Sequence, residues 1–247
     1  MKRLLHLALI VSSIAAAQQP APAPDLTQAL QRLATIAASL THSLPSFTCQ
    51  ESIISQRIYK KKVEQQVNFT ANLRVNRTAN NTLSESFAVL TLNGKPFPGG
   101  TFNMPTYVSG GFDRAILYFS STIQPCFSYR LSPHRIDFEG LPDPTCIYQG
   151  THGFALLDAD GNVTHLERTV PPDQARYRAL ADFAAFDFAD INLNGHTFRL
   201  SRHLTADVNE GRTTGHFEAT YTNCHLFSAT VTIGPATEMP PDNSKPQ

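Results

Sequence analysis

The stretch that decides the fold is VEQQVNFTANLRVN, residues 63–76, in which apolar and polar side chains alternate almost without interruption. Successive side chains of a β-strand point to opposite faces, so this stretch predicts a long strand with an apolar inner face and a polar outer face. The same alternation returns towards the C-terminal end, in residues 213–221 and again in residues 225–233. We therefore expect an antiparallel sheet that is buried on one face.

Hairpin turns separate these alternating segments. Asn93-Gly94, Asp160-Gly161, Asn194-Gly195 and Glu210-Gly211 are dipeptides that favour tight connections between antiparallel strands. Together, alternation and turns predict strands over residues 48–60, 63–77, 83–93, 126–130, 134–139, 152–158, 163–169, 183–192, 196–206, 212–222 and 225–234.

An amphipathic helix precedes the first strand. Asp25 is a suitable N-cap, apolar residues recur at helical spacing from Leu26 to Leu40, and Pro45 ends the segment. A shorter helix is predicted to begin near Gly110 and to carry Phe112, Ala115, Ile116 and Phe119. The expected fold class is α+β: a mostly antiparallel, curved β-sheet (a half-barrel) with the N-terminal helix and the short second helix on its concave face.

The N-terminal residues 1–17 have the features of a signal peptide. Lys2 and Arg3 precede the apolar run Leu4–Ile14, which is too short to span a bilayer, and Ala15–Ala17 provide small residues for cleavage near Ala17. The expected organisation is a signal peptide (1–17), a Pro/Ala spacer (18–24), one β-rich domain (25–234) and a disordered tail (235–247). We expect a bacterial protein that is periplasmic or secreted.

Composition excludes some classes of partner. Removal of Lys2 and Arg3 leaves 18 of the 20 basic residues against 20 acidic ones, so the net charge is about −2. No strong positive field is present to attract nucleic acid, and no segment is expected to make this an integral membrane protein. The basic run Lys60–Lys62 indicates a solvated turn, with contact to membrane headgroups as the alternative.

The chain contains four cysteines: Cys49, Cys126, Cys146 and Cys224. An even number in an exported chain indicates disulfides, and four cysteines allow three pairings. We prefer Cys126 with Cys146, which lie close in sequence, and therefore Cys49 with Cys224. A zinc site is the competing interpretation, but the sequence lacks the usual Cys and His ligand spacings, so no metal is predicted.

Short motifs that suggest catalysis or ion binding have structural explanations. Asp158–Asn162 begins like a calcium loop but lacks the later glycine and glutamate, so it is predicted to be a hairpin turn. Ser109-Gly110-Gly111 does not match a nucleophile elbow, because Tyr107 stands where that motif needs glycine. No catalytic residue and no cofactor are assigned.

Two histidine–glutamate pairs have the spacing of side chains that share one face of a strand. They are His165 with Glu167 and His216 with Glu218, and each pair has the chemistry for acid–base work or metal binding. Because both pairs fall on the polar or mixed face, we interpret them as solvated surface pairs. His225 alternates with apolar residues and is predicted to be buried.

A helix that follows a signal peptide, and then Phe47-Thr48-Cys49-Gln50-Glu51 at the start of a β-meander, resembles the periplasmic lipoprotein-carrier (Lol-type) half-barrels. The chain is similar also to exported acidobacterial relatives, in which a segment like Ser109–Phe112 precedes a helix and a hairpin like Leu157–Val163 follows. The resemblance covers about residues 26–234. It implies a hydrophobic cavity under the sheet, which the carriers use for acyl chains.

The first functional hypothesis is thus an exported, non-enzymatic protein that binds a lipid or another apolar ligand between sheet and helix. The alternative is an exported structural or interaction module of the cell envelope, with a closed core and a protein partner. A third hypothesis, an enzyme that uses a His/Glu pair, ranks below both. The candidate cavity residues are Leu30, Leu33, Ile36, Val67, Phe69, Leu73, Phe217, Phe227 and Val231.

Overall fold

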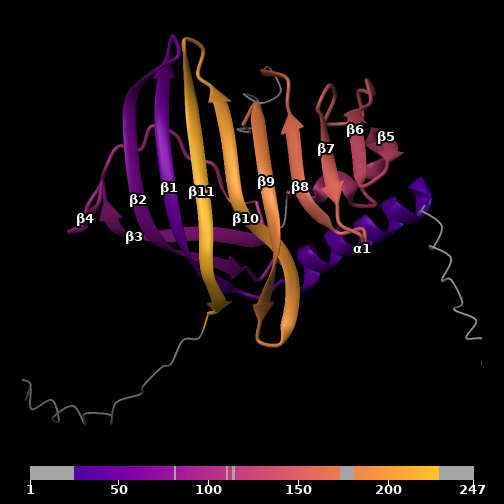
Figure 1. Ribbon diagram of the computed structural model, residues 1–247, viewed down its shortest axis with the longest axis horizontal. Helices are drawn as coiled ribbons and strands as arrows, with labels where there is room; N and C mark the ends of the chain where they lie inside the picture. Colours follow the sequence, from indigo (N-terminus) through magenta and orange to yellow (C-terminus); the bar gives the residue numbers. More distant parts are fainter. Residues whose placement is uncertain (1–24, 81, 110, 113–114, 173–180, 228–247) are drawn as a thin grey trace, which may run out of the picture.

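The computed structural model describes residues 25–80, 82–109, 111–112, 115–172 and 181–227. One helix, α1 (Leu26–Ser43), precedes an open sheet with the strand order β4-β3-β2-β1-β11-β10-β9-β8-β7-β6-β5, in which every neighbouring pair is antiparallel (Figure 1). The predicted fold class is therefore confirmed. The strands are β1 (Phe47–Tyr59), β2 (Lys62–Arg77), β3 (Leu83–Leu92), β4 (Lys95–Pro96), β5 (Phe127–Ser132), β6 (Arg135–Gly140), β7 (His152–Leu157), β8 (Val163–Thr169), β9 (Phe183–Leu193), β10 (His196–Asn209) and β11 (Thr213–Leu226).

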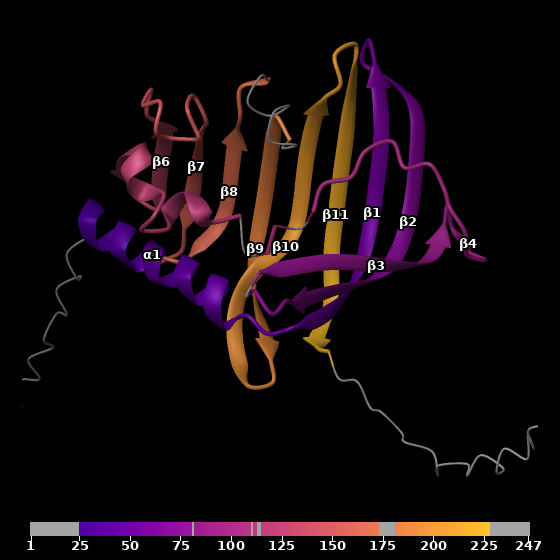
Figure 2. The same ribbon diagram turned by 180° about the vertical axis from the view of Figure 1, so that it is seen from behind.

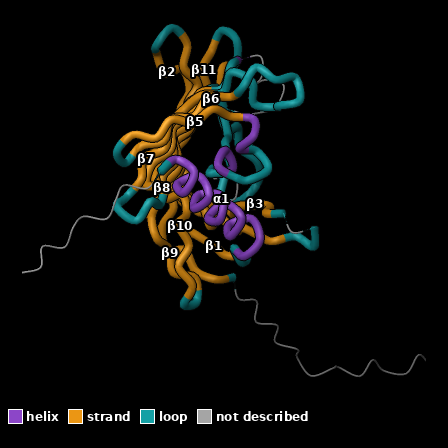
Figure 3. The backbone as a smooth tube through the Cα atoms, turned by 90° about the vertical axis from the view of Figure 1, so that its right-hand side faces the viewer, coloured by secondary structure: helices purple, strands orange, loops and turns teal. Residues whose placement is uncertain are grey.

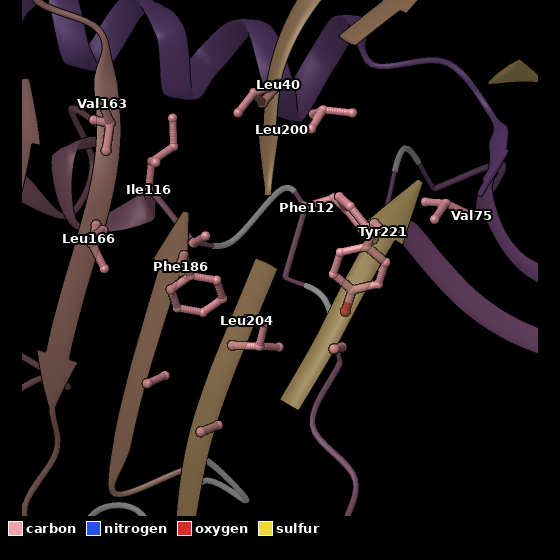
Figure 4. Close-up of a cluster of buried hydrophobic side chains, with 14 of the residues drawn as sticks. Leu40, Val75, Phe112, Ile116, Val163, Leu166, Phe186, Leu200, Leu204 and Tyr221 are labelled. Atoms are coloured by element: carbon pink, nitrogen blue, oxygen red, sulfur yellow. The ribbon is translucent and has the colours of Figure 1, made fainter. Parts of the chain in front are cut away.

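The helix and the long loops lie on one side of the sheet, which we call the inner face. In the edge-on view of Figure 3 most strands gather on one side, while α1, β3 and most of the loop after β4 lie on the other. Side chains from α1 and from the inner face form the core, and Figure 4 shows Leu40 of α1 beside Leu200 of β10. The outer face has no such cover among the described elements, which explains why polar residues alternate with apolar ones along the strands.

Helix α1 is capped at both ends by side chains. At its start, Oδ1 of Asp25 accepts a hydrogen bond from the backbone N–H of Gln28 at 2.8 Å. At its end, the Arg77 guanidinium of β2 donates to the carbonyl oxygens of Leu44 (2.7 Å), Thr41 (2.7 Å) and Leu40 (3.3 Å). A cation at the C-terminal end of a helix also complements the helix dipole. Arg77 therefore fixes the end of α1 to the sheet.

A second contact holds the middle of α1. Nε2 of Gln124 donates to the carbonyl oxygen of Leu30 at 2.9 Å and to that of Phe119 at 2.7 Å. The predicted second helix lies here and takes the form of turns followed by a 3-10 turn, Leu117–Phe119, while Phe112, Ala115, Ile116 and Phe119 are buried as expected. The predicted start at Gly110 lies outside the described residues.

The first and last strands meet in the middle of the sheet. β1 pairs with β11 along most of its length, and the Cys49–Cys224 disulfide joins them across a sequence separation of 175 residues. The other disulfide, Cys126–Cys146, spans 20 residues between the start of β5 and the loop after β6. Both pairings are those predicted from the sequence.

The prediction of two separate strands near the C-terminal end is wrong, because a β-bulge lies within one continuous strand. Instead of two strands, 212–222 and 225–234, a single strand β11 continues to Leu226, with an irregularity opposite Cys49 and a positive φ of 52° at Asn223. One extra residue in a strand exchanges the inward and outward positions that follow it. Cys224 therefore reaches Cys49, whereas His225 and Phe227 are exposed, contrary to the prediction that both are buried. Residues 228–234 lie outside the described residues.

The predicted orientation of Val63 is also wrong. Val63 was predicted to lie on the inner face, but its side chain is 51% exposed. A register shift between Arg57 and Ile58 of β1 lies opposite this end of β2 and interrupts the phase of the alternation. From Val67 to Val75 the inner residues are buried as predicted.

The segment after β4, residues 97–109, crosses the inner side of β2, β1 and β11, and we call it the strap (Figure 2). Ser55 of β1 holds it in place: its Oγ donates to the carbonyl oxygen of Thr106 at 2.7 Å and accepts from the Thr106 N–H at 3.0 Å. Gly215 of β11 leaves the room this approach needs, because a Cβ there would lie 2.8 Å from Cβ of Thr106.

We predict that Arg77→Met lowers the free energy of unfolding by about 2–3 kcal/mol, because it leaves helix carbonyls without their charged donor. Urea denaturation followed by circular dichroism measures this loss. Arg74→Met is the matched control on the same strand, since Arg74 is exposed and lies over the Phe227 ring at 4.2 Å; it should cost less than about 1 kcal/mol. Equal losses for the two variants would contradict the role given to Arg77.

Candidate functional site

The structure places most of the predicted cavity residues in packed core. Leu33, Leu73 and Phe217 are fully buried, Phe69 and Val67 are nearly so, and Leu30 and Ile36 are half-buried against the same core. Phe227 is 37% exposed and packs on Arg74, because the bulge at Asn223 turns the positions that follow it to the opposite face. Val231 lies outside the described residues.

The two histidine–glutamate pairs belong to a chain of contacts on the outer face. His165 contacts Glu167 through Nε2 (3.1 Å) and Asp187 through Nδ1 (2.6 Å). His203 continues the chain from Asp187 (3.4 Å) to Glu218 (3.1 Å). Four neighbouring strands, β8 to β11, are thereby linked side chain to side chain.

These contacts support the surface interpretation of the pairs, with one change. His216 contacts Asp207 at 2.7 Å rather than Glu218, its predicted partner, which contacts His203. Burial alone lowers the pKa of His165, but its hydrogen bonds to Asp187 and Glu167 outweigh this and raise the pKa. The described residues contain no group of three or more His, Cys, Asp or Glu side chains arranged to hold a metal ion.

Two hollows in the described surface are lined mainly by outward-facing residues. One, of about 440 Å³, lies over β5, β6 and β7, with Arg135, Asp137 and Phe154 in its wall. The other, of about 310 Å³, lies over β1, β2 and β11, between Ile54, Asn68 and Thr220. Neither hollow lies in the predicted space between sheet and helix.

A carboxyl group is buried in the middle of the inner face. Glu51 stands on β1 between Cys49 and Ile53, and only 2% of its surface is exposed. Its direct neighbour across the β1–β11 pairing is Tyr221, which is fully buried and whose ring packs 4.9 Å from Phe112 (Figure 4). The Tyr221 hydroxyl and the Glu51 carboxyl interact with each other, but among the described residues neither Oε2 of Glu51 nor the hydroxyl of Tyr221 has a hydrogen-bond partner at good geometry.

A second acid faces the first from the other wall of the half-barrel. β3 curls over the inner face (Figure 2), and its inward-facing Glu85 interacts with the Tyr107 hydroxyl of the strap and with the charges around Glu51. Burial and the negative charge of Glu85 raise the pKa of Glu51 to about 8, although the Tyr221 hydroxyl opposes the rise. Burial and the same carboxylates raise the pKa of both tyrosines.

The wall around these groups is aromatic and partly open. Tyr107 lies 5.5 Å from Phe87 of β3 and 5.5 Å from Phe217 of β11, measured between ring centroids. The inner residues of β1 are buried, whereas those of β3 are half-buried. We call the group formed by Glu51, Glu85, Tyr107 and Tyr221 the acid–tyrosine cluster. At neutral pH its buried carboxyl is protonated, which makes it a hydrogen-bond donor in an apolar setting.

Glu51 ends the motif Phe47–Glu51 but was not predicted to be a site residue. A signal was present, because Glu51 occupies the inner phase of the alternation between Cys49 and Ile53. An acidic residue in that phase predicts a buried carboxyl. The partners Glu85 and Tyr107 carry no such signal, since only the curl of β3 and the course of the strap bring them to it.

Similarity to known proteins is found among solved structures. No family model matches the chain, and no curated protein is significantly similar to it. The similar solved structures include a LolA superfamily protein from Nitrosomonas europaea (10% identity, TM-score 0.34, covering 81% of this chain and 94% of that one). They also include a putative outer membrane lipoprotein-sorting protein domain from Vibrio parahaemolyticus (10%, TM-score 0.42, 78% and 90%) and a DUF1329 family protein from Desulfovibrio piger (7%, TM-score 0.40, 82% and 95%).

The expected resemblance to the lipoprotein-carrier half-barrels is confirmed to this extent. At these identities and TM-scores, the similarity carries no argument about the ligand or activity of this chain. The closer similarity to acidobacterial proteins stays a prediction.

We predict that Glu51→Gln makes the protein more stable at pH 8 and removes part of its pH dependence. In the wild type, the unfolded chain ionises Glu51 near pH 4.5 while the folded chain keeps it protonated up to about pH 8. Stability is therefore full below pH 4.5 and falls as the pH rises to 8, by at most about 1.4 kcal/mol per unit.

Thermal melting of the wild type and the variant between pH 5 and pH 8 measures this difference. Glu64→Gln, an exposed glutamate on β2, is the control and should follow the wild type. Parallel melting curves for wild type and Glu51→Gln across this range would show that Glu51 is ionised in the folded protein.

Proposed function

We propose that this protein is an exported, non-enzymatic binding protein that holds a lipid or another apolar ligand on the inner face, between β3 and the strap. The observation that carries the proposal is the contrast between the two walls of the half-barrel. The inner side chains of β1 are buried, but Leu83, Phe87, Val89 and Leu92 of β3 remain half-buried although they face inward. An apolar inner wall left partly open is where an apolar ligand gains most from burial.

Export is supported by the cysteines. All four are paired in disulfides, which persist in oxidising compartments outside the cytoplasm. The signal peptide of residues 1–17, the spacer, the domain end at 234 and the tail remain part of the proposal. Within the described residues, no helix is long and apolar enough to cross a bilayer.

We place the proposed ligand away from α1. Arg77 and Gln124 hold that helix at its end and in its middle, and Leu33 and Ala37 on its inner side are fully buried. A helix fixed in this way is part of the core rather than a lid. The same observation favours the alternative function, an exported interaction module of the cell envelope with a closed core, for which the edge strand β5 offers unpaired backbone groups to a partner.

We predict that the folded protein binds the uncharged apolar dye N-phenyl-1-naphthylamine and that Val89→Ser weakens this binding about tenfold, because it places a hydroxyl on the ligand-facing wall. Dye fluorescence titration measures the affinity. Ala88→Ser is the matched control, since Ala88 is the next residue on the same strand and is exposed on the opposite face. Native mass spectrometry of protein purified from its own host should show a co-purified lipid; a mass without ligand, together with no dye binding, would favour the interaction module.

We predict that Leu33→Asp unfolds the protein rather than opening a lid. An unpaired carboxylate at this fully buried position should cost several kcal/mol, on the order of the whole stability of a domain. Thermal melting compares it with Gln31→Asp, an exposed position on the same helix, which should melt close to the wild type. A Leu33→Asp variant that melts normally but has lost dye binding would make α1 a movable cover after all.

A further inference from the structure

We propose that the ligand of the inner face carries a protonated amine, and that Oε2 of Glu51 and the hydroxyl of Tyr221 receive it. This inference rests on the proposed function and names the chemical class of the ligand: an apolar molecule with one hydrogen-bond-donating ammonium group. The ammonium end lies in the acid–tyrosine cluster, and the apolar part lies along the half-buried wall of β3.

The first support is the pair of unsatisfied polar atoms. Glu51 and Tyr221 are 2% and 0% exposed, and among the described residues neither Oε2 nor the tyrosine hydroxyl has a well-formed hydrogen-bond partner. Buried polar groups are almost always paired, because each one left without a partner is destabilising. The two atoms belong to neighbouring residues of β1 and β11 on the inner face, so one ligand group that donates several hydrogen bonds can satisfy both.

The second support is the sign of the charge around them. Glu85 adds a second carboxyl from β3. Among the described residues, the side chains that act on Glu51 are Glu85 and the Tyr221 hydroxyl, and Glu51 in turn acts on Tyr107 of the strap. None of these groups is basic. An ammonium ion supplies the charge that lets Glu51 ionise, whereas an anionic ligand would add repulsion.

The third support is the ring environment. Tyr107 lies between Phe87 and Phe217, and Tyr221 packs on Phe112, so the two tyrosines that interact with the acids belong to a group of aromatic rings. Aromatic faces attract cations, and they also accept the apolar carbon atoms next to an amine nitrogen. Metal binding does not account for this arrangement, because the described residues hold no group of three metal-ligating side chains.

Binding is then coupled to loss of one proton. Glu51 is protonated in the free protein at pH 7, and its carboxyl proton leaves to solvent when the ammonium ion arrives, so that a carboxylate faces the cation. The affinity for an amine should therefore rise as the pH increases from 6 to about 8, as long as the amine itself stays protonated. The affinity for an uncharged ligand of the same length should not change over this range.

The experiment is calorimetric titration with dodecylamine and with dodecanol, which share a chain and differ in the head group. We expect the wild type to bind dodecylamine at least about tenfold more tightly than dodecanol, the ratio given by one charge-assisted hydrogen bond. Repeating the titration at pH 7 in buffers with different ionisation enthalpies should show release of about one proton per dodecylamine and none per dodecanol.

Glu51→Gln should lose both the preference for dodecylamine over dodecanol and the proton release. Tyr221→Phe should weaken dodecylamine binding and leave the proton release intact. Glu64→Gln, exposed on β2, is the control and should behave as the wild type. Thermal melting of each variant verifies that it is folded.

The outcomes separate this inference from the function on which it rests. Equal affinities for the amine and the alcohol, or a preference that survives Glu51→Gln, would overturn the amine site and leave an apolar binding protein. Failure of the folded wild type to bind dodecylamine, dodecanol or the uncharged dye would overturn the binding function itself.

Discussion

An open, curved sheet cannot leave its apolar inner face in water, and the rest of this structure follows from that constraint. Each segment that lies on the inner face is held there by a specific contact rather than by apolar packing alone. Arg77 holds the end of α1, Gln124 holds its middle, and Ser55 holds the strap through Thr106. In each contact, a polar side chain forms a hydrogen bond with a backbone group next to an apolar surface. Burial would otherwise leave that backbone group unpaired. The cover is therefore assembled from separate pieces, each with its own attachment.

A cover made of pieces need not be equally complete everywhere. Under α1 the core is closed, and the Leu33 side chain is fully buried in it. Under the strap the wall of β3 stays half-buried, and the buried carboxyl of Glu51 lies near a second acid, Glu85. Such an arrangement lowers the stability of the folded protein. The Glu51 carboxyl can stay in the apolar interior only if it is protonated or if it is ionised without a partner, and both states are unfavourable. Natural proteins tolerate costs of this kind mainly where a function needs them, and here the cost and the opening fall in the same place.

Local patterns were sufficient to predict most of the fold. Alternation in Val67–Val75 and the Asn-Gly and Asp-Gly turns are short-range signals, and such signals predicted most of the strands and hairpins correctly. The even number of cysteines and the short separation of Cys126 and Cys146 led to the correct disulfides. The errors arose where one residue changes the phase of a strand. The bulge at Asn223 is not visible as a break in alternation, yet it moves His225 and Phe227 to the outside. The acid–tyrosine cluster could be predicted only in part, because Glu51 lies in an inner phase of the pattern, whereas Glu85 and Tyr107 reach it through the curl of β3 and the path of the strap.

The pairing of β1 with β11 also has a consequence for the order in which the chain can be completed. A chain that emerges N-terminus first presents β1 with β2 on one side and nothing on the other until residues 213–226 arrive. During that interval an amphipathic strand keeps a free hydrogen-bonding edge, which is the feature that recruits wrong neighbours during folding. Because its central contact joins the two ends of the domain, folding is expected to be slow and to be completed only after residues 213–226 have become available. A helper that shields strand edges during that delay would matter more to this protein than to one whose neighbouring strands all follow one another in sequence.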